Sequence, residues 1–232
     1  MQAWVEHEIL HIGAEAEVTS GLFLGRKSVQ KRRTERNWRH PDLDRRLCKS
    51  RMSAEARILI RLHKIGIQVP KLRQVNLEGR TMILSKLSGH PVIDLLRGKC
   101  ETPDGDEWQK EMLSEIGIIV RKLHRNGVSH GDLSTNNIFW CPSNGASLLD
   151  FGLSRITEDI EHYGIDLHIL HEILGASHPS IENAMQILLS GYQSIDIEGK
   201  KLIMTGGGVL PTCKQIIKRY EDIITRVRYA DN

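Results

Sequence analysis

The stretch from His130 to Ser154, HGDLSTNNIFWCPSNGASLLDFGLS, constrains the fold of this chain more than any other segment. Its centre predicts a β-hairpin, because two apolar runs, NIFWC and ASLLDF, flank the turn-forming residues PSNG. Asp132 and Asn137 precede the hairpin, and Asp150 closes it. Fixed polar residues on both sides of a hairpin form a specific pattern, although a hairpin with incidental carboxylates is the simpler alternative.

The order HxDxxxxN and then DFG is typical of phosphoryl transfer from ATP. Such a reaction needs the triphosphate and magnesium held and an acceptor hydroxyl aligned. Asp132 can accept the proton of that hydroxyl, and Asn137 and Asp150 can bind the magnesium ions. His130 is expected to support the loop rather than to titrate. The sequence therefore predicts Asp132 as a catalytic residue and Asn137 and Asp150 as metal ligands.

Two upstream features predict how ATP is held. Lys31 ends a predicted strand, and Glu55 lies early on the following helix, where it can orient Lys31 through an ion pair. The loop GAEAEV could cover the phosphates with the backbone N–H groups of Gly13, Ala14, Glu15 and Ala16, although it has one glycine rather than three. ATP and Mg²⁺ are the predicted cofactors, and Lys31 joins Asp132 as a catalytic residue.

The first part of the chain predicts mainly strands. EILHIG leads into the loop, TSGLFLGRKSVQK predicts two strands around a turn at Leu24–Arg26, and VPKLRQVNLEGRTMILSKL predicts a pair with a turn at Glu78–Gly79. One helix, SAEARILIRLHKIGI, is expected between them and should end at Gly66.

The second part predicts mainly helices. DEWQKEMLSEIGIIVRKLHRNG carries an apolar stripe, with Asp106 as a possible N-cap and Gly127 as the end. Three later helices are expected in IDLHILHEILG, SIENAMQILLSGY and CKQIIKRYEDIITRVRY, with TGGGVLPT as a loop. The order predicts an α+β, reduced bilobal fold, with a β-rich N-lobe at 1–88, a helical C-lobe at 89–232 and a cleft between them.

Three residues of the region after the hairpin need separate interpretation. Asp166 is expected at a helix start, where its carboxylate either braces the catalytic loop or acts as a plain N-cap. His168 and His171 are spaced i, i+3 but have no third ligand nearby in the sequence pattern. They are therefore interpreted as surface or core residues, not as metal ligands.

Composition and charge exclude several classes of protein. Apolar residues make up 40% of the chain, enough for a packed core, but no apolar run approaches the ~20 residues of a membrane span. The N-terminal residues contain acids and no apolar core, so no secretory signal is expected. The four cysteines are scattered, which argues against a disulfide framework or a cysteine zinc site and favours cytosol or nucleus.

A basic stripe, Arg32–Arg51, could contact nucleic-acid phosphates or form a solvated face.

Taken together, the motifs resemble those of the small atypical kinase subunit of the KEOPS (EKC) complex, a relative of the RIO kinases. The resemblance rests on GAEAEV, RHPDLDRRL, EARILIRLHKIGI, HGDLSTNNIF, LLDFGLS and GIDLHIL. It implies a serine/threonine kinase and ATPase in a complex that helps make threonylcarbamoyladenosine on tRNA. It implies two partners, a threonylcarbamoyltransferase on the C-lobe and a small regulatory subunit on the N-lobe, and roles for Lys31, Glu55, Asp132, Asn137 and Asp150 as above.

Gly131 stands where ordinary protein kinases carry arginine, and no APE follows between Asp150 and Asp166. Both features favour a protein without activation-loop control. Two alternatives stay open. A small-molecule kinase of the aminoglycoside or choline type also uses HGD, but needs a larger C-lobe. An ATP-binding scaffold without turnover has no chemical reason to keep the complete residue set.

Overall fold

The computed structural model describes residues 3–13, 15–177, 181–196, 202–203 and 208–230. The chain divides into two compact units, Met1–Leu87 and Ser88–Asn232. Within the described ranges, no helix combines the length and apolarity that a membrane crossing requires. The four cysteines, Cys48, Cys100, Cys141 and Cys213, are free.

The first unit is built on a five-stranded antiparallel sheet with the order β1-β2-β3-β5-β4. Its elements are β1 (Trp4–Ile12), β2 (Ala16–Phe23), β3 (Arg26–Arg33), α1 (Pro41–Lys64), β4 (Leu72–Asn76) and β5 (Thr81–Ser85). The predicted turn between β2 and β3 is confirmed, and Leu24 and Gly25 take φ angles of 49° and 76° there. Two consecutive positive φ angles match the right-handed twist of the two strands that they join.

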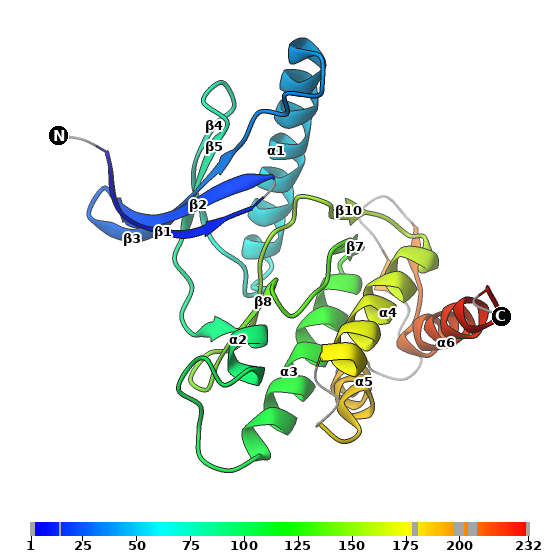
Figure 1. Ribbon diagram of the computed structural model, residues 1–232. Coiled ribbons are helices and arrows are strands. Elements are labelled where there is room, and N and C mark those ends of the chain that lie inside the picture. Colours follow the sequence, from blue (N-terminus) through cyan, green and yellow to red (C-terminus); the bar gives the residue numbers. More distant parts are fainter. Residues whose placement is uncertain (1–2, 14, 178–180, 197–201, 204–207, 231–232) are drawn as a thin grey trace. The chain divides into compact units, whose positions relative to one another are not determined.

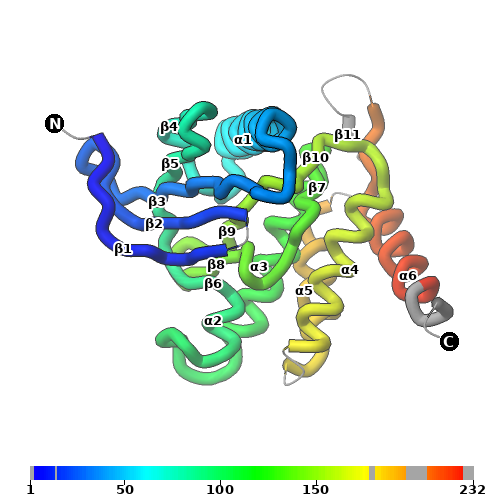
Figure 2. Tube along the Cα trace, turned by 45° about the horizontal axis from the view of Figure 1, so that its top comes forward, coloured from blue at the N-terminus to red at the C-terminus, as the bar shows by residue number. Residues whose placement is uncertain are grey.

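Helix α1 is longer than the sequence pattern predicts, because it begins at Pro41 and contains much of the basic stripe. Proline suits the first turn of a helix, and the preceding His40 accepts a hydrogen bond from the Asp42 N–H at 3.3 Å through Nδ1. The predicted end is confirmed, since Gly66 follows the helix with a φ of 77°. Figures 1 and 2 show α1 beside the β4–β5 pair.

The second unit is mainly helical. It contains β6 (His90–Pro91), α2 (Val92–Leu96), α3 (Glu107–His124), β7 (Val128–Ser129), β8 (Ile138–Cys141), β9 (Gly145–Leu148), β10 (Arg155–Ile156), α4 (Ile160–Ser177), α5 (Ala184–Ser194), β11 (Leu202–Ile203), β12 (Val209–Leu210) and α6 (Cys213–Ala230). Strands β6, β8 and β9 form one small sheet, and β7 pairs with β10. The predicted hairpin is confirmed as β8–β9, paired in register from Ile138–Leu148 to Cys141–Gly145.

The core of the second unit depends on a very close crossing of α3 and α5. A Cβ atom at Gly117 of α3 would lie 2.0 Å from the Leu188 carbonyl oxygen, and one at Gly191 of α5 would lie 2.1 Å from the Ser114 carbonyl oxygen. The two backbones therefore touch at the glycines, and larger residues such as Met112, Leu113, Ile116 and Val120 fill the buried space around them. Helix α4 packs against α6, as Figure 2 shows.

Asp106 is confirmed at the N-cap position of α3, although its side chain makes no capping hydrogen bond. Two other predictions about this unit need correction. Asp166 is not at a helix start, because α4 begins at Ile160 and Asp166 lies inside it. The loop predicted at Thr205–Thr212 contains β12, which pairs with β11, and its residues 205–207 lie outside the described residues.

Candidate active site

Asp166 holds the backbone of the loop that joins β7 to β8. Its Oδ2 accepts a hydrogen bond from the His130 N–H at 2.7 Å, and its Oδ1 accepts one from the Gly131 N–H at 2.8 Å. The side chain is fully buried, where hydrogen bonds to a carboxylate are strong. The predicted bracing of the loop is thus confirmed, although Asp166 does it from the interior of α4.

His130 ties the same loop to the end of the hairpin. Its Nε2 lies 2.8 Å from the Leu149 carbonyl oxygen, and its Nδ1 lies 3.3 Å from the Asp132 N–H nitrogen. Its ring packs on that of Phe151, with 5.0 Å between the ring centroids. Every polar atom of the ring is therefore engaged with the backbone, in agreement with the predicted supporting role.

Asn137 fixes the side chain of Asp132. Its Nδ2 donates to the Asp132 carbonyl oxygen at 2.9 Å and to the Asp132 carboxylate Oδ2 at 3.0 Å. Since the amide nitrogen is used in this way, the amide oxygen is the atom of Asn137 that can serve a metal ion. Asp132 itself is exposed, so its carboxylate can be reached by an acceptor hydroxyl or by water.

Asp150 follows β9 in a left-handed backbone conformation, with a φ of 52°. Its Oδ1 accepts a hydrogen bond from the Gly152 N–H at 3.1 Å, which stabilises the turn. The preceding residue, Leu149, donates its N–H to the Asn137 carbonyl oxygen at 2.9 Å. The backbone on either side of the hairpin is thus tied together at the two predicted metal ligands, both of which offer the oxygen donors that Mg²⁺ prefers.

The backbone around position 131 explains why glycine, and not arginine, stands there. The φ of Gly131 is 79°, and a Cβ atom at this position would lie 2.5 Å from the Leu153 carbonyl oxygen. A hydrogen bond from the Ser154 hydroxyl to the His130 carbonyl oxygen, at 2.8 Å, joins the same two segments. An arginine could not occupy this position without moving the segment after Asp150. The predicted absence of activation-loop control stays a prediction.

In the first unit, Glu55 binds two cations. Its Oε1 lies 3.0 Å from Lys31 Nζ, and its Oε2 accepts from Arg33 Nη2 at 2.8 Å. The predicted ion pair of Lys31 and Glu55 is therefore present. Arg33 was not predicted, although it follows Lys31 by two positions on β3 and must point to the same face of the sheet. With a side-chain exposure of only 2%, the Glu55 carboxylate needs both partners.

The loop between β1 and β2 uses one of the four amides that were predicted to cover the phosphates. The Gly13 N–H already donates to the Ala16 carbonyl oxygen at 2.9 Å, so this amide is used within the turn. Ala14 lies outside the described residues. Ala16 is buried at the start of β2, and the carboxylate of Glu15 turns towards arginines of the basic stripe.

Much of the charge in the basic stripe is neutralised inside the first unit. Glu15 pairs with Arg33, Arg36 and Arg51, Asp44 pairs with Arg39 and Arg80, and Glu78 pairs with Lys49. The hydrogen bond from Arg80 holds the pKa of Asp44 below its ordinary value. A small cavity of about 20 Å³ is lined by several of these side chains. Arg45 and Arg46 of α1 are exposed, and the pair that Arg45 forms with Asp42 at 3.4 Å is exposed on both sides, so water screens it. These two arginines are the part of the stripe best placed to meet an external anion.

A buried network behind Asp166 was missed by the sequence reasoning. His124, at the end of α3, lies 2.7 Å from Tyr192 Oη through Nδ1 and 3.2 Å from Asp166 Oδ2 through Nε2. Burial lowers the pKa of His124, so the ring is neutral at neutral pH. Arg121, one turn earlier, donates to both carboxylate oxygens of Asp196 at 2.8 and 2.6 Å. The available signal was the presence of two polar residues on an otherwise apolar helix face.

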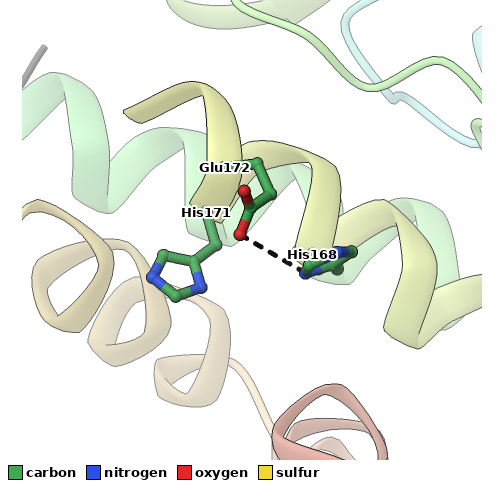
Figure 3. A group of neighbouring side chains, drawn as sticks. All are labelled: His168, His171 and Glu172. Atoms are coloured by element: carbon green, nitrogen blue, oxygen red, sulfur yellow. Dashed lines mark ion pairs between the residues drawn. The ribbon is translucent and has the colours of Figure 1, made fainter. Parts of the chain in front are cut away.

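One premise about the two histidines on α4 needs correction, namely that no third ligand lies nearby. His168 and His171 do have a third potential ligand, because Glu172 lies beside them and the three ligand atoms lie within 4.8 Å of one another. Figure 3 shows the three side chains on the same helix, with the ion pair drawn between His168 and Glu172.

Comparisons with known proteins identify the family. Residues 14–191 match the family model described as the lipopolysaccharide kinase (Kdo/WaaP) family. The EKC/KEOPS complex subunit bud32 of Dictyostelium discoideum is 31% identical, over 82% of this chain and 76% of its own length. The chain belongs to the Bud32 family. Another member, the EKC/KEOPS complex subunit Tp53rkb of Mus musculus, is 30% identical over 80% of this chain and 78% of its own.

The chain is also similar to parts of longer proteins. The probable bifunctional tRNA threonylcarbamoyladenosine biosynthesis protein of Methanocorpusculum labreanum is 34% identical over 85% of this chain, which spans only 34% of that relative. A crystal structure of the Rio2 kinase-ADP/Mg²⁺-phosphoaspartate complex from Chaetomium thermophilum matches 97% of this chain and 72% of its own, with a TM-score of 0.60 and 14% identity. The likeness to Rio2 confirms the predicted α+β fold of the reduced kinase type.

Proposed function

We propose that this chain is a Mg-ATP-dependent atypical serine/threonine protein kinase and ATPase that works as a subunit of a KEOPS/EKC complex and supports threonylcarbamoyladenosine modification of tRNA. One observation carries the chemical part of this proposal. Asp166 accepts hydrogen bonds from the backbone of the loop that bears Asp132, and Asn137 donates one to the Asp132 carboxylate. The names of the relatives support the assignment to the complex.

The proposed roles follow from the hydrogen bonds. The Asp132 carboxylate receives the proton of the acceptor, either a serine or threonine hydroxyl or water, because its Oδ2 is oriented by Asn137 while the side chain is exposed. Lys31, oriented by Glu55, binds the phosphates of ATP. Asn137 and Asp150 offer oxygen ligands that fit Mg²⁺, which when bound neutralises charge on the phosphates.

The chemical proposal is tested by Asp132→Asn, which keeps the shape of the side chain but removes its basicity. We expect ATP hydrolysis and autophosphorylation to fall by about 100-fold or more, the usual range for losing a general base. Asp150→Asn should weaken nucleotide binding in Mg²⁺ but not in EDTA. The matched control is Asp104→Asn, at an exposed position outside the site. Turnover that is unchanged in Asp132→Asn would overturn the catalytic assignment.

The assignment to the complex is tested separately. We propose that the threonylcarbamoyltransferase subunit binds the unit Ser88–Asn232 and that the small regulatory subunit binds the unit Met1–Leu87. Affinity purification from native lysate should recover both partners, and adding them back should raise the ATPase rate of the purified chain. Recovery of neither would contradict the assignment while leaving the chemistry of Asp132 untouched.

Two alternatives give different results in the same assays. A small-molecule kinase of the aminoglycoside or choline type would transfer phosphate to a sugar or alcohol without any partner. A scaffold would bind Mg-ATP without turnover even when the partners are present. The four free cysteines fit the proposed cytoplasmic and nuclear localisation, since both compartments keep thiols reduced.

A further inference from the structure

Helix α4 carries a group of three potential metal ligands outside the proposed catalytic residues. The ligand atoms of His168, His171 and Glu172 lie within 4.8 Å of one another. His168 Nδ1 is 3.9 Å from Glu172 Oε1. Figure 3 shows all three side chains on one stretch of the helix.

The spacing explains why the three residues meet. Residues three and four positions apart are neighbours on the surface of a helix, so His168 faces both His171 and Glu172. Because all three side chains leave the same helix, the spacing of their backbone atoms is fixed. Binding a common ion, at about 2.0–2.2 Å from each ligand atom, requires side-chain rotation that brings the atoms closer than the separations of up to 4.8 Å seen without an ion.

The surroundings favour a bound cation. His168 Nδ1 is buried and has no hydrogen-bond partner among the residues that the structure describes, an unusual state for a buried ring nitrogen. The His171 ring packs edge-on against Tyr220 of α6, with 5.7 Å between the ring centroids, which restricts its orientation. The Glu172 side chain is 63% exposed, so an ion can enter from solvent on that side.

We propose that His168, His171 and Glu172 bind one divalent transition-metal ion, and that Zn²⁺ fits the ligand set best. Two imidazoles and one carboxylate are typical ligands of an open zinc site, in which water takes the remaining position. Mg²⁺ is a poor match because it prefers oxygen ligands. The site is independent of the proposed phosphoryl transfer.

A bound ion would also stabilise the helix that supports the catalytic loop. Asp166 lies one half-turn before His168 on α4 and accepts the His130 and Gly131 amides. A metal ion that joins His168 to Glu172 spans the following turn of the same helix. Binding to the folded state alone raises the temperature of unfolding in proportion to the logarithm of ion concentration, which gives a readout that does not depend on activity.

The test uses the full chain with Zn²⁺ or Co²⁺ as the probe, in excess Mg²⁺ so that oxygen-only sites are filled. We expect one tightly bound ion per chain, an unfolding temperature that rises with Zn²⁺, and a Co²⁺ spectrum without the thiolate charge-transfer band that cysteine ligands would give. Glu172→Gln and His171→Gln should weaken Zn²⁺ binding at least about 10-fold. Loss of a residue that only hydrogen-bonds a metal ligand already costs about 10-fold or more in affinity.

The matched control is His162→Gln, on the same helix but outside the cluster, which should bind as the wild type does. Glu172→Gln decides the outcome if a histidine variant unfolds, because the exposed Glu172 side chain contributes little to the core. Absence of a bound ion in the wild type would overturn the proposal. So would equal binding by the wild type and Glu172→Gln, or an equal loss in His162→Gln.

Discussion

Gly131 combines a positive φ of 79° with a carbonyl oxygen only 2.5 Å from where its Cβ would lie. Gly98 also has a positive φ, of 65°, but a Cβ there would meet nothing within 4 Å. The two glycines share the backbone conformation that L-residues resist, and they differ in the space around them. Comparing them separates the cost of the conformation from the cost of the close approach.

We expect Gly98→Ala to lower the free energy of unfolding by about 1–2 kcal/mol, the cost of a left-handed alanine. Gly131→Ala should cost more, because the Leu153 carbonyl must also move, and it should slow ATP turnover by displacing the loop next to Asp132. Urea denaturation and an ATPase assay measure the two effects. Equal losses of stability for both variants would show that the contact with Leu153 is unimportant.

At the scale of single residues, the candidate site residues and their contacts were predictable where a short sequence pattern specifies them. Asp132, Asn137 and Asp150 belong to one short pattern, and the pairing of Lys31 with Glu55 follows from the order strand and then helix. The second cation on Glu55 could have been inferred from strand alternation. The contact of Gly131 with Leu153 could not, because it depends on how a later segment folds back.

Helix α3 links the catalytic loop to the packing of the second unit through His124. Burial lowers the pKa of His124 from its ordinary value of 6.5, and the nearby Arg121 and His130 oppose its protonation further, while Asp166 partly favours it. In the unfolded chain the same imidazole binds a proton near pH 6.5. As the pH falls below 6.5, the unfolded state therefore gains a proton that the folded state does not, and stability is lost.

We expect the free energy of unfolding to fall between pH 6.5 and 5 by up to about 1.4 kcal/mol per pH unit from this one group. His124→Gln should be less stable at pH 7.5, because it loses the bond to Tyr192, but should show a shallower decline in acid. Denaturation at a series of pH values measures both. The half-exposed His162 is the control, and a steep acid decline that persists in His124→Gln would contradict the prediction.

The space around two helical glycines, one at the crossing of α3 and α5 and one on α4, predicts opposite effects for their substitution by alanine. Gly117→Ala places a methyl group 2.0 Å from the Leu188 carbonyl oxygen, so the helices must separate, and we expect a loss of about 1–3 kcal/mol or more. Gly175→Ala, on α4 where nothing lies within 4 Å, should stabilise the protein by up to about 1 kcal/mol through helix propensity. Thermal unfolding distinguishes the two, and destabilisation by both would refute the argument from space.

The elements were predictable where periodicity was strong and less so at their boundaries. The β8–β9 hairpin and the β4–β5 pair follow from apolar runs around turn residues. The start of α1 was missed because its first turns, in RHPDLDRRLCKS, carry alternating charge rather than an apolar stripe. Asp44 and Cys48 are buried there, so ion pairs and a narrow apolar strip hold the start of α1 in place. A search for apolar periodicity does not detect such a combination.

For the whole molecule, the number of Lys and Arg residues in the basic stripe overstates its free positive charge. Within the described part of the first unit, Glu15, Asp44 and Glu78 neutralise several of its cations. Counterion release, which drives nucleic-acid binding, requires cations that can reach phosphates. A tRNA contact by this chain alone is therefore expected to be weak and to depend on the exposed Arg45 and Arg46 of α1.

We expect Arg45→Gln with Arg46→Gln to weaken tRNA binding and to reduce the slope of log K against log salt by about 1 for each phosphate contact removed. The matched control, Lys110→Gln with Lys122→Gln, removes the same charge from exposed positions of α3. Filter binding between 50 and 200 mM salt, the range in which ~6–10 contacts change affinity steeply, measures both slopes. If both pairs reduce the slope equally, net charge rather than the stripe governs the contact, and the role of α1 is excluded.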